Sequence, residues 1–297
     1  MRKDNLSYTI TVIGGDYRHL LLYESFVEKG FSVSGIALTD STNPCSHENS
    51  SILSTALLPS DIWIAGIPFT KDDKHIYAEN SNYRITLEHF FHYLDKHPPK
   101  LLIAGHFSEV ALNYARKYQI PCHDLLKCNS LAIANANPTA EGAIYHAIKE
   151  SPYVLHKAPC LILGFGKCAK TLARKLKGLD AKVTICARKE DDLAYAENMG
   201  LKAISFDQLK EELPNYLFLF NTVPAFVLTE ENLEYCSKQC TIIDLASMPG
   251  GIDFTAAKKL NLHVSHCLGL PGALSPKTAT DILSKQICQL LFNNTLT

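Results

Sequence analysis

The segment CLILGFGKCA, residues 160–169, decides the fold of this chain. An apolar run predicts a strand that ends at Leu163, and Gly164, Gly166 and Ala169 follow it in the spacing G-x-G-x-x-A. The first glycine permits a tight turn, the second lets the backbone approach a pyrophosphate, and the small third residue lets a helix pack closely on the strand. The N-terminus of that helix offers free N–H groups to phosphates. The segment therefore predicts a dinucleotide-binding turn.

The residues around this turn complete a βαβ unit. We expect a helix over 167–176 and a second strand over 182–186. Without that context the motif is weak, because an ordinary strand–turn–helix that holds no ligand can carry the same spacing. The residues predicted to hold the pyrophosphate are Gly164, Phe165, Gly166, Lys167 and Ala169.

The end of the second strand bears on the choice of cofactor. Rossmann domains that prefer NAD place Asp or Glu there, to bind the ribose 2′-hydroxyl, whereas this chain has Arg188 followed by Lys189. A guanidinium binds a 2′-phosphate by charge and by paired hydrogen bonds, so the sequence favours NADP. Glu190 and Asp191 come next and leave NAD open, unless they form only a solvated charge run.

Polar residues also follow two later apolar runs, FLF and TII. Ligands of doubly wound sheets lie beyond the carboxyl ends of the strands, so these residues are expected to face the nicotinamide end of the cofactor. The turn over 248–251 (MPGG) would let a ligand come close, although it is also a common Gly/Pro turn. The cofactor-binding residues predicted here are Asn221, Thr222, Val223, Pro224, Asp244, Leu245 and Ala246.

Strands that alternate with helices predict a mostly parallel sheet in each half of the chain. We expect an α/β protein of two Rossmann-like domains, the second a complete doubly wound dinucleotide-binding sheet, joined by two crossing helices. Residues 1–136 would form the first domain and 151–274 the NAD(P)-binding domain. The expected strands are 8–13, 31–38, 61–65, 100–104 and 119–122 in the first domain, and 159–163, 182–186, 201–205, 216–220, 241–244 and 262–266 in the second. The helices expected in the first domain are 20–27, 84–96 and 109–118, and residues 39–51 are expected to form a loop.

Two helices are expected to cross between the domains. The first, over 137–150, would begin with Asn137 as N-cap and Pro138 in its first turn, and the second, over 275–297, repeats this with Ser275 and Pro276. The second would pack back on the first domain. Both N-termini would lie near the cleft and suit carboxylates, or they are simply well-capped linkers.

Composition excludes several classes of function. The chain has 297 residues, a net charge of -1 and 46% hydrophobic residues, so it presents no basic field for nucleic acid and can bury a large core. It has no apolar run long enough for a membrane span and no signal-peptide segment at its start, which points to the cytoplasm. Its ten cysteines include no C-x-x-C pair, so we expect reduced packing residues and no metal.

Motifs spread over most of the chain give it a family resemblance. They are VIGGDYR (12–18), NPTAEGAI (137–144), LILGFGK (161–167), FNTVPA (220–225), IDLASMPGGIDF (243–254) and GLPGALSPKTATDIL (269–283). With them the chain resembles the family of dipicolinate synthase A-subunits of endospore-forming bacteria. It departs from the family over 40–100, and at Ala169, where many relatives have glycine.

The resemblance implies an oxidoreductase that forms pyridine-2,6-dicarboxylate from dihydrodipicolinate or its hydroxytetrahydro precursor, with NADP or NAD as acceptor. It also implies expression in the mother cell during sporulation and a partner, the flavoprotein-like B-subunit of dipicolinate synthase, in an oligomer. The site residues predicted for substrate binding and catalysis are Asp16, Arg18, Asn137, Thr139, Glu141, Ser247, Asp253 and Lys277.

The roles within this set are only partly assigned. Arg18 and Lys277 would hold the substrate carboxylates, and we expect them to flank the ring only if the two domains close over it. The sequence does not choose a base among Asp16, Glu141 and Asp253. His106 and His266 each follow or end a strand and could transfer protons, but they lie outside the family motifs.

Two other functions remain open at this point. One is another NADP-dependent dehydrogenase of a small carboxylic acid, built from two domains. The other is a nucleotide-binding scaffold that only supports a partner protein. The polar set of Thr139, Glu141, Ser247 and Lys277 argues against a scaffold.

Overall fold

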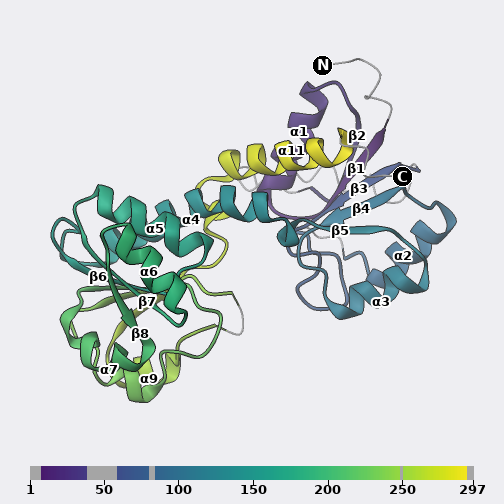
Figure 1. Cartoon of the computed structure of the whole chain (residues 1–297). Helices are drawn as coiled ribbons and strands as arrows, with labels where there is room; N and C mark the ends of the chain where they lie inside the picture. Colours follow the sequence, from purple (N-terminus) through teal and green to yellow (C-terminus); the bar gives the residue numbers. More distant parts are fainter. Residues whose placement is uncertain (1–7, 39–58, 80–83, 248–249, 293–297) are drawn as a thin grey trace. The chain divides into compact units, whose positions relative to one another are not determined.

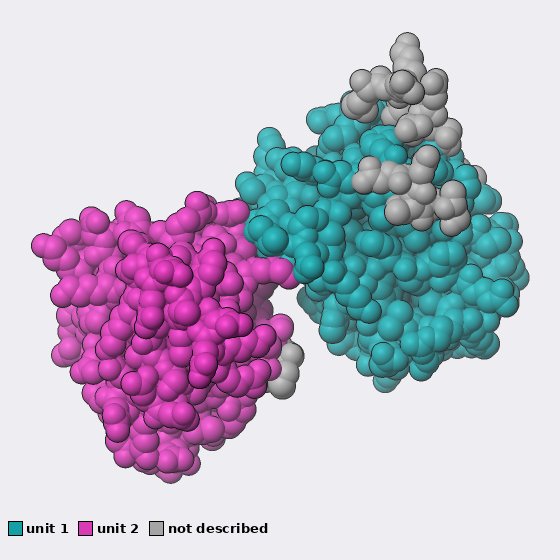
Figure 2. Space-filling view, in the orientation of Figure 1, with its two compact units in different colours: residues 1–134, 275–297 teal, residues 135–274 magenta. Residues whose placement is uncertain are grey.

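The structure is a computed structural model that describes residues 8–38, 59–79, 84–247 and 250–292. The chain divides into two compact units (Figure 2). Each unit contains one parallel sheet. Unit 1 comprises residues 1–134 and 275–297, and unit 2 comprises residues 135–274. The predicted α/β class with two parallel sheets is therefore confirmed.

The sheet of unit 1 has five parallel strands in the order β2-β1-β3-β4-β5. The order reverses between β1 and β3, which makes the carboxyl ends of these two strands the switch point, where ligands of such sheets bind. The elements are β1 (Thr9–Ile13), α1 (Tyr17–Glu28), β2 (Ser32–Ile36), β3 (Ile62–Ala65), α2 (Leu87–Lys96), β4 (Leu101–Ala104), α3 (Glu109–Lys117) and β5 (Cys122–Asp124), with a 3₁₀ turn at Leu125–Lys127.

Both faces of this sheet are covered. One face packs around Trp63 with aromatic residues of α2, such as Phe90 and Phe91. The other face packs on α1 and on α11 (Pro276–Phe292), which lie side by side in Figure 1. The apolar stripe of α11, which includes Leu283 and Ile287, is buried there.

The sheet of unit 2 has six parallel strands in the order β11-β10-β9-β6-β7-β8, which is the doubly wound dinucleotide-binding order. Its switch point lies between β6 and β9. The strands are β6 (Pro159–Leu163), β7 (Lys182–Ala187), β8 (Lys202–Ser205), β9 (Phe218–Asn221), β10 (Thr241–Asp244) and β11 (His263–His266). The helices are α5 (Lys167–Gly178), α6 (Glu190–Asn198), α7 (Leu209–Glu212), α8 (Glu230–Leu233), α9 (Phe254–Lys259) and α10 (Leu270–Leu274), with 3₁₀ turns at Phe206–Gln208 and Leu213–Asn215.

The first connecting helix differs from its prediction. Helix α4 runs over Asn129–Glu150, so Pro138 lies inside it and Asn137 is not its N-cap. The helix begins earlier because Leu131 in its first turn is buried with the core of unit 1. A proline inside a helix removes one backbone hydrogen bond and crowds the preceding turn, which disfavours the helix, but α4 nevertheless continues through Pro138.

Smaller differences occur at the ends of elements. Helix α1 begins at Tyr17 because Asp16 caps it, and α2 begins at Leu87 with Thr86 as its cap. Strand β5 starts later than predicted, because Gln119 ends α3 with φ of 53°. Residues Leu270–Leu274, within the motif 269–283, form the short helix α10. Cys45 and the loop predicted over 39–51 lie outside the described residues.

Candidate functional site

The fingerprint turn has the form that a pyrophosphate needs. Gly164 adopts φ of +91°, and a Cβ added there would lie 2.7 Å from the Thr222 hydroxyl oxygen. Gly166 is the N-cap of α5, and a Cβ added there would meet nothing within 4 Å. The first position is therefore tightly packed, whereas the second faces open space at the start of a helix of 12 residues.

The first turn of α5 fits an anion. It contains no acidic side chain and begins with Lys167. Ala169 is fully buried, so the small third residue of the fingerprint does let the helix pack on the sheet. Phe165 is also buried, with its ring 6.1 Å from that of Tyr195, so only its backbone can serve a ligand. These residues together fit a dinucleotide pyrophosphate.

A row of polar residues lies along the carboxyl edge of the same sheet. The register pairs Leu163 with Asn221, Asn221 with Asp244, and Asp244 with His266. The ends of β6, β9, β10 and β11 are therefore level. Asn221 and Asp244 are fully buried, and the Asn221 amide donates to Asp244 Oδ1 at 2.8 Å.

Backbone groups on both sides hold this row in place. The Val223 N–H donates to Asn221 Oδ1 at 3.1 Å, and the Ala246 N–H donates to Asp244 Oδ1 at 3.2 Å. A Cβ added at Gly251 would collide with the Asn221 amide, so only glycine leaves room for it. The amide of Asn221 therefore has one orientation, with its nitrogen toward Asp244.

Of the other residues predicted at this edge, some are held by hydrogen bonds and some are exposed to solvent. Thr222 closes the fingerprint turn, because its hydroxyl donates to the Leu163 carbonyl at 2.8 Å. The Leu245 N–H donates to the Asn221 carbonyl at 2.8 Å. Pro224 and Ser247 are exposed. Met248 and Pro249, part of the turn predicted to approach a ligand, lie outside the described residues.

Arg188 and Lys189 are exposed directly after β7. Lys189 is the N-cap of α6, whose first turn consists of Glu190, Asp191 and Asp192. Acidic residues stabilise a helix N-terminus, so this charge run has a structural role whichever cofactor binds. The preference for NADP stays a prediction.

In unit 1, the turn after β1 lies at the switch point of the sheet. Gly15 has φ of +83°, and its N–H donates to the Tyr77 carbonyl at 2.7 Å. Asp16 follows as the N-cap of α1 and accepts from the Arg18 N–H at 3.1 Å. The segment of β1 and α1 therefore presents Asp16 and Arg18 where the topology predicts a ligand.

Arg18 is held by two neighbours. Its guanidinium donates to both oxygens of Asp16 and, at 3.3 Å, to the Ile67 carbonyl. Burial alone would raise the pKa of Asp16. The contacts with His19 and Arg18 lower this pKa by more than burial raises it, so the pKa lies well below its usual range. A carboxylate with so low a pKa is a weak base, which argues against Asp16 as the proton acceptor.

The residue Lys277 lies in the same unit as Arg18. Thr280, one turn further along α11, donates its hydroxyl to the Arg18 carbonyl at 3.1 Å. The helices that carry Arg18 and Lys277, α1 and α11, pack together within unit 1. The expectation that the two cations flank a substrate ring when the domains close stays a prediction. Lys277 is exposed in the first turn of α11.

Three predicted site residues lie within α4 and not at a helix start. Since Pro138 is inside the helix, Asn137 and Thr139 do not lie at a helix N-terminus. The Thr139 hydroxyl donates to the Asn135 carbonyl at 2.8 Å. Glu141 is exposed and forms an ion pair with Lys175 at 2.7 Å. Helix α4 therefore does not provide one of the two helix N-termini that were predicted to lie near the cleft.

Asp253 has a structural partner as well. It is the N-cap of α9, and its Oδ1 accepts from the Ala256 N–H at 2.9 Å. His106 follows β4 with φ of 53°, and its N–H donates to Asp124. Sequence reasoning set His266 aside, although the polar ends of FLFN, TIID and HVSH predict its place in the row.

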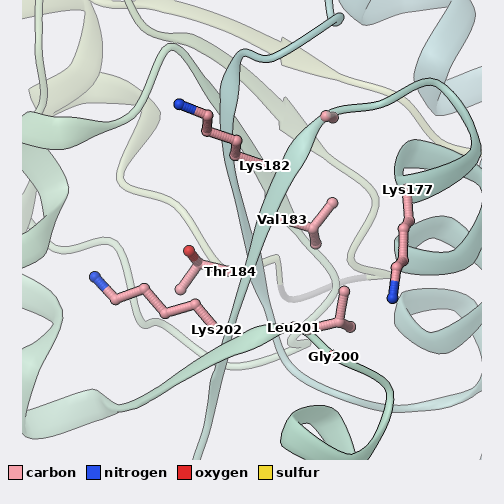
Figure 3. Close-up of a pocket in the computed structure, with 8 residues that line it drawn as sticks. Lys177, Lys182, Val183, Thr184, Gly200, Leu201 and Lys202 are labelled. Carbon is pink, nitrogen blue, oxygen red and sulfur yellow. The ribbon is translucent and has the colours of Figure 1, made fainter.

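A surface hollow in unit 2 gathers three lysines, but it is not the fingerprint site. Figure 3 shows it at the amino ends of β7 and β8, lined by Lys177, Lys182 and Lys202. Lys177 donates to the Met199 carbonyl at 2.6 Å, and Lys202 pairs with Glu212 at 2.7 Å. Two of its three lysines thus already have a hydrogen-bond or ion-pair partner. The hollow also lies at the edge of the sheet opposite the fingerprint turn.

Two classes of site are not found in the part of the chain that the structure describes. No group of three or more His, Cys, Asp or Glu side chains there could hold a metal ion. No helix there is long and apolar enough to cross a membrane. The cysteines within these ranges are free thiols.

The fold and the fingerprint place the chain in the class of proteins built from two Rossmann-like units. The apo-structure of D-lactate dehydrogenase from Escherichia coli has this fold, with a TM-score of 0.63 at 14% identity over 95% of both chains.

Sequence comparison is more specific. Residues 9–126 match the model of the N-terminal domain of the dipicolinate synthase A-subunit. The chain is 31% identical to the dipicolinate synthase A-subunit of Bacillus subtilis (strain 168) over 290 residues, which cover 95% of each. The crystal structure of the dipicolinate synthase A-subunit from Bacillus halodurans has a TM-score of 0.86 at 28% identity and covers 96% of this chain and 97% of that one. The chain belongs to the family of dipicolinate synthase A-subunits.

Proposed function

We propose that this chain oxidises dihydrodipicolinate, or its hydroxytetrahydro precursor, to dipicolinate during sporulation. The observation that carries the proposal is the carboxyl edge of the unit 2 sheet. There an open pyrophosphate turn at Gly166 lies beside a level row of polar strand ends. Membership of the dipicolinate synthase family supplies the substrate class.

The cofactor in this proposal is NADP or NAD. When bound, it would accept the hydride that leaves the substrate ring. The fingerprint residues Gly164–Ala169 would hold its pyrophosphate, and the exposed Arg188 would pair with a 2′-phosphate. Thr222 and the backbone around Asp244 would line the nicotinamide end.

The substrate carries two carboxylates, and each must be paired before it is buried. Arg18 and Lys277 are the cations that we assign to them, supported by their places on the packed helices α1 and α11. Arg18 suits a carboxylate because its guanidinium is already oriented by Asp16. Loss of a hydride and a proton from dihydrodipicolinate makes the ring aromatic, which drives the reaction. The hydroxytetrahydro precursor would have to lose a molecule of water as well.

The family name also supports a partner. As an A-subunit, the chain would act with a flavoprotein-like B-subunit in an oligomer, in the cytoplasm of the mother cell. Catalysis by the isolated chain is nevertheless expected, because the cofactor turn is complete within unit 2.

A single-turnover measurement tests the function. The purified chain, in excess over dihydrodipicolinate prepared immediately before mixing, is followed at the absorbance band of the reduced nicotinamide with NADP or NAD. We expect one equivalent of reduced cofactor and one of dipicolinate. Reduction with other small hydroxy or amino acids but not with the dihydropyridine would indicate a different dehydrogenase. Cofactor binding without any reduction, with the B-subunit present as well, would indicate a scaffold.

A further inference from the structure

We infer that His266 is the residue that removes the proton from the substrate, and that Asp244 positions it. This inference rests on the proposed oxidation. It starts from the row of strand ends, in which His266 is the residue paired in register with Asp244.

Asp244 is a buried carboxylate in which one oxygen, Oδ1, accepts hydrogen bonds and the other, Oδ2, accepts none from the described part of the chain. Its side chain is fully buried, and Oδ1 accepts from both Asn221 and the Ala246 N–H. Its Oδ2 is buried and has no hydrogen-bond partner within the described residues. His266 Nε2 lies 3.7 Å from this oxygen. Since an unpaired buried carboxylate is costly, this oxygen is aimed at a donor, and the imidazole is the side chain placed to supply it.

The surroundings of Nε2 determine which ring nitrogen carries the proton. Nε2 also lies 3.4 Å from the Ala246 carbonyl, so both of its neighbours are acceptors. A neutral imidazole in this position must carry its proton on Nε2, which leaves the lone pair of Nδ1 free. The ring of Phe254 lies 5.2 Å from the imidazole and limits its rotation. The His266 side chain is 29% exposed, and its polar contacts within the described residues are made by Nε2 and not by Nδ1.

The carboxylates considered as bases are engaged elsewhere. Asp16 pairs with Arg18, Asp253 caps α9, and Glu141 pairs with Lys175. His266 differs from all three because its fixed partners occupy only one of its two nitrogens. His263 lies at the amino end of β11, away from the row of strand ends, and its Nε2 lies 3.3 Å from Glu150.

The step balances without a further reactant. A dihydropyridine loses two electrons and two protons, as one hydride and one proton, when it becomes a pyridine. The C–H hydride passes to the oxidised nicotinamide, while the ring proton passes to Nδ1 of His266. The imidazolium that forms is stabilised by Asp244, and it releases its proton to solvent after the product leaves. This is the positioning role that a carboxylate plays beside a catalytic histidine.

Kinetics of three chains test the proton transfer. His266→Ala should lower the single-turnover rate at least 100-fold, about the contribution of a positioned base. Its affinity for the cofactor should stay within twofold, and added imidazole should restore part of the rate. His263→Ala is the matched control on the same strand and should keep the wild-type rate. A His266→Ala rate within threefold of wild type, or a loss that imidazole does not restore, would overturn the assignment.

A measurement without substrate tests the pairing independently. The ¹⁵N chemical shifts of His266 in the free wild-type protein should show the Nε2-protonated tautomer at pH 8. Asp244→Asn should weaken this preference and lower kcat more than it raises KM. A His266 tautomer protonated on Nδ1 in the wild-type protein would overturn the pairing. If instead the wild-type chain reduces no cofactor while the tautomer is as expected, the proposed function fails and the Asp244–His266 pair stands.

Discussion

The Asp16 carboxylate accepts two hydrogen bonds from the Arg18 guanidinium, at 2.9 Å from Nε to Oδ1 and at 2.6 Å from Nη2 to Oδ2. Both side chains are mostly buried, with exposed fractions of 17% and 12%. The guanidinium therefore has a fixed direction before any ligand arrives, which reduces the entropy lost when a carboxylate binds.

This pair predicts a pH-dependent stability. Asp16→Asn keeps an N-cap side chain but removes the charge, so it should lower the free energy of unfolding by about 1.5–3 kcal/mol at pH 7. Since the folded pKa of Asp16 is lowered, its contribution is complete above the ordinary value of about 3.9 and is lost as the pH falls below it. Urea unfolding at pH 7, 5 and 3 should show the difference between the two proteins narrowing at pH 3.

The control for this experiment is Glu28→Gln, an exposed carboxylate at the far end of the same helix. We expect it to change the free energy of unfolding by less than about 0.5 kcal/mol. A constant difference between wild type and Asp16→Asn from pH 7 to 3 would contradict the charge pairing.

Arg188 predicts the choice of cofactor. Arg188→Asp should weaken NADP binding by about 1.5–3 kcal/mol, the value of a hydrogen bond to a charged group, and should affect NAD less. Titration calorimetry with both cofactors measures the two changes. Lys182→Asp, an exposed charge reversal at the opposite end of β7, should leave both affinities unchanged. If Arg188→Asp weakened the binding of NADP and NAD equally, this result would contradict the pairing of Arg188 with the 2′-phosphate.

Lys277 predicts an effect on the substrate alone. Lys277→Ala should raise KM for the dihydropyridine or lower kcat by about tenfold, because a carboxylate loses its cation, with cofactor affinity nearly unchanged. Lys285→Ala, also exposed on α11 but further along the helix, is the control and should behave as wild type. If both variants changed KM or kcat to the same extent, the result would indicate a general effect of charge on the helix and not a contact between Lys277 and the substrate.

The cysteines predict a reduced protein without metal. Burial raises the pKa of the Cys160, Cys186 and Cys236 thiols to about 12, so these thiols should react slowly with iodoacetamide in the native state at pH 8. After denaturation without reductant, all ten thiols of the chain should be labelled. A protected pair, or one equivalent of zinc in the purified protein, would show that this prediction is wrong.

Local sequence was a good guide to the sheets and a poor guide to the connections. Strands such as β6 and β10 begin and end where their apolar runs do. The start of α4 was missed because Pro138 resembles a helix start, and only the tertiary burial of Leu131 shows that the helix has already begun. The N-cap role of Asp16 does not follow from the sequence, because Asp16 and Arg18 equally fit a ligand-binding pair.

In the candidate site, too, local features could be predicted from the sequence, whereas contacts between distant segments could not. The fingerprint glycines could be predicted from their spacing within a βαβ unit, since each glycine serves the local backbone. The pairing of Asp244 with His266 depends on the register of β10 with β11, which no local pattern states. Aligning the last residue of each predicted strand places these two side by side. The orphaned Asp244 Oδ2 still becomes visible only when the side chains are placed.

The discontinuity of unit 1 has a consequence for biosynthesis. Leu283, Ile287 and Leu291 of α11 complete the face of the unit 1 core that includes Leu22 and Phe26. The ribosome makes them only after the whole of unit 2, residues 135–274, so unit 2 can reach its final fold while unit 1 still shows an uncovered apolar face. A nascent chain stalled before residue 275 should therefore bind chaperones through its first 134 residues.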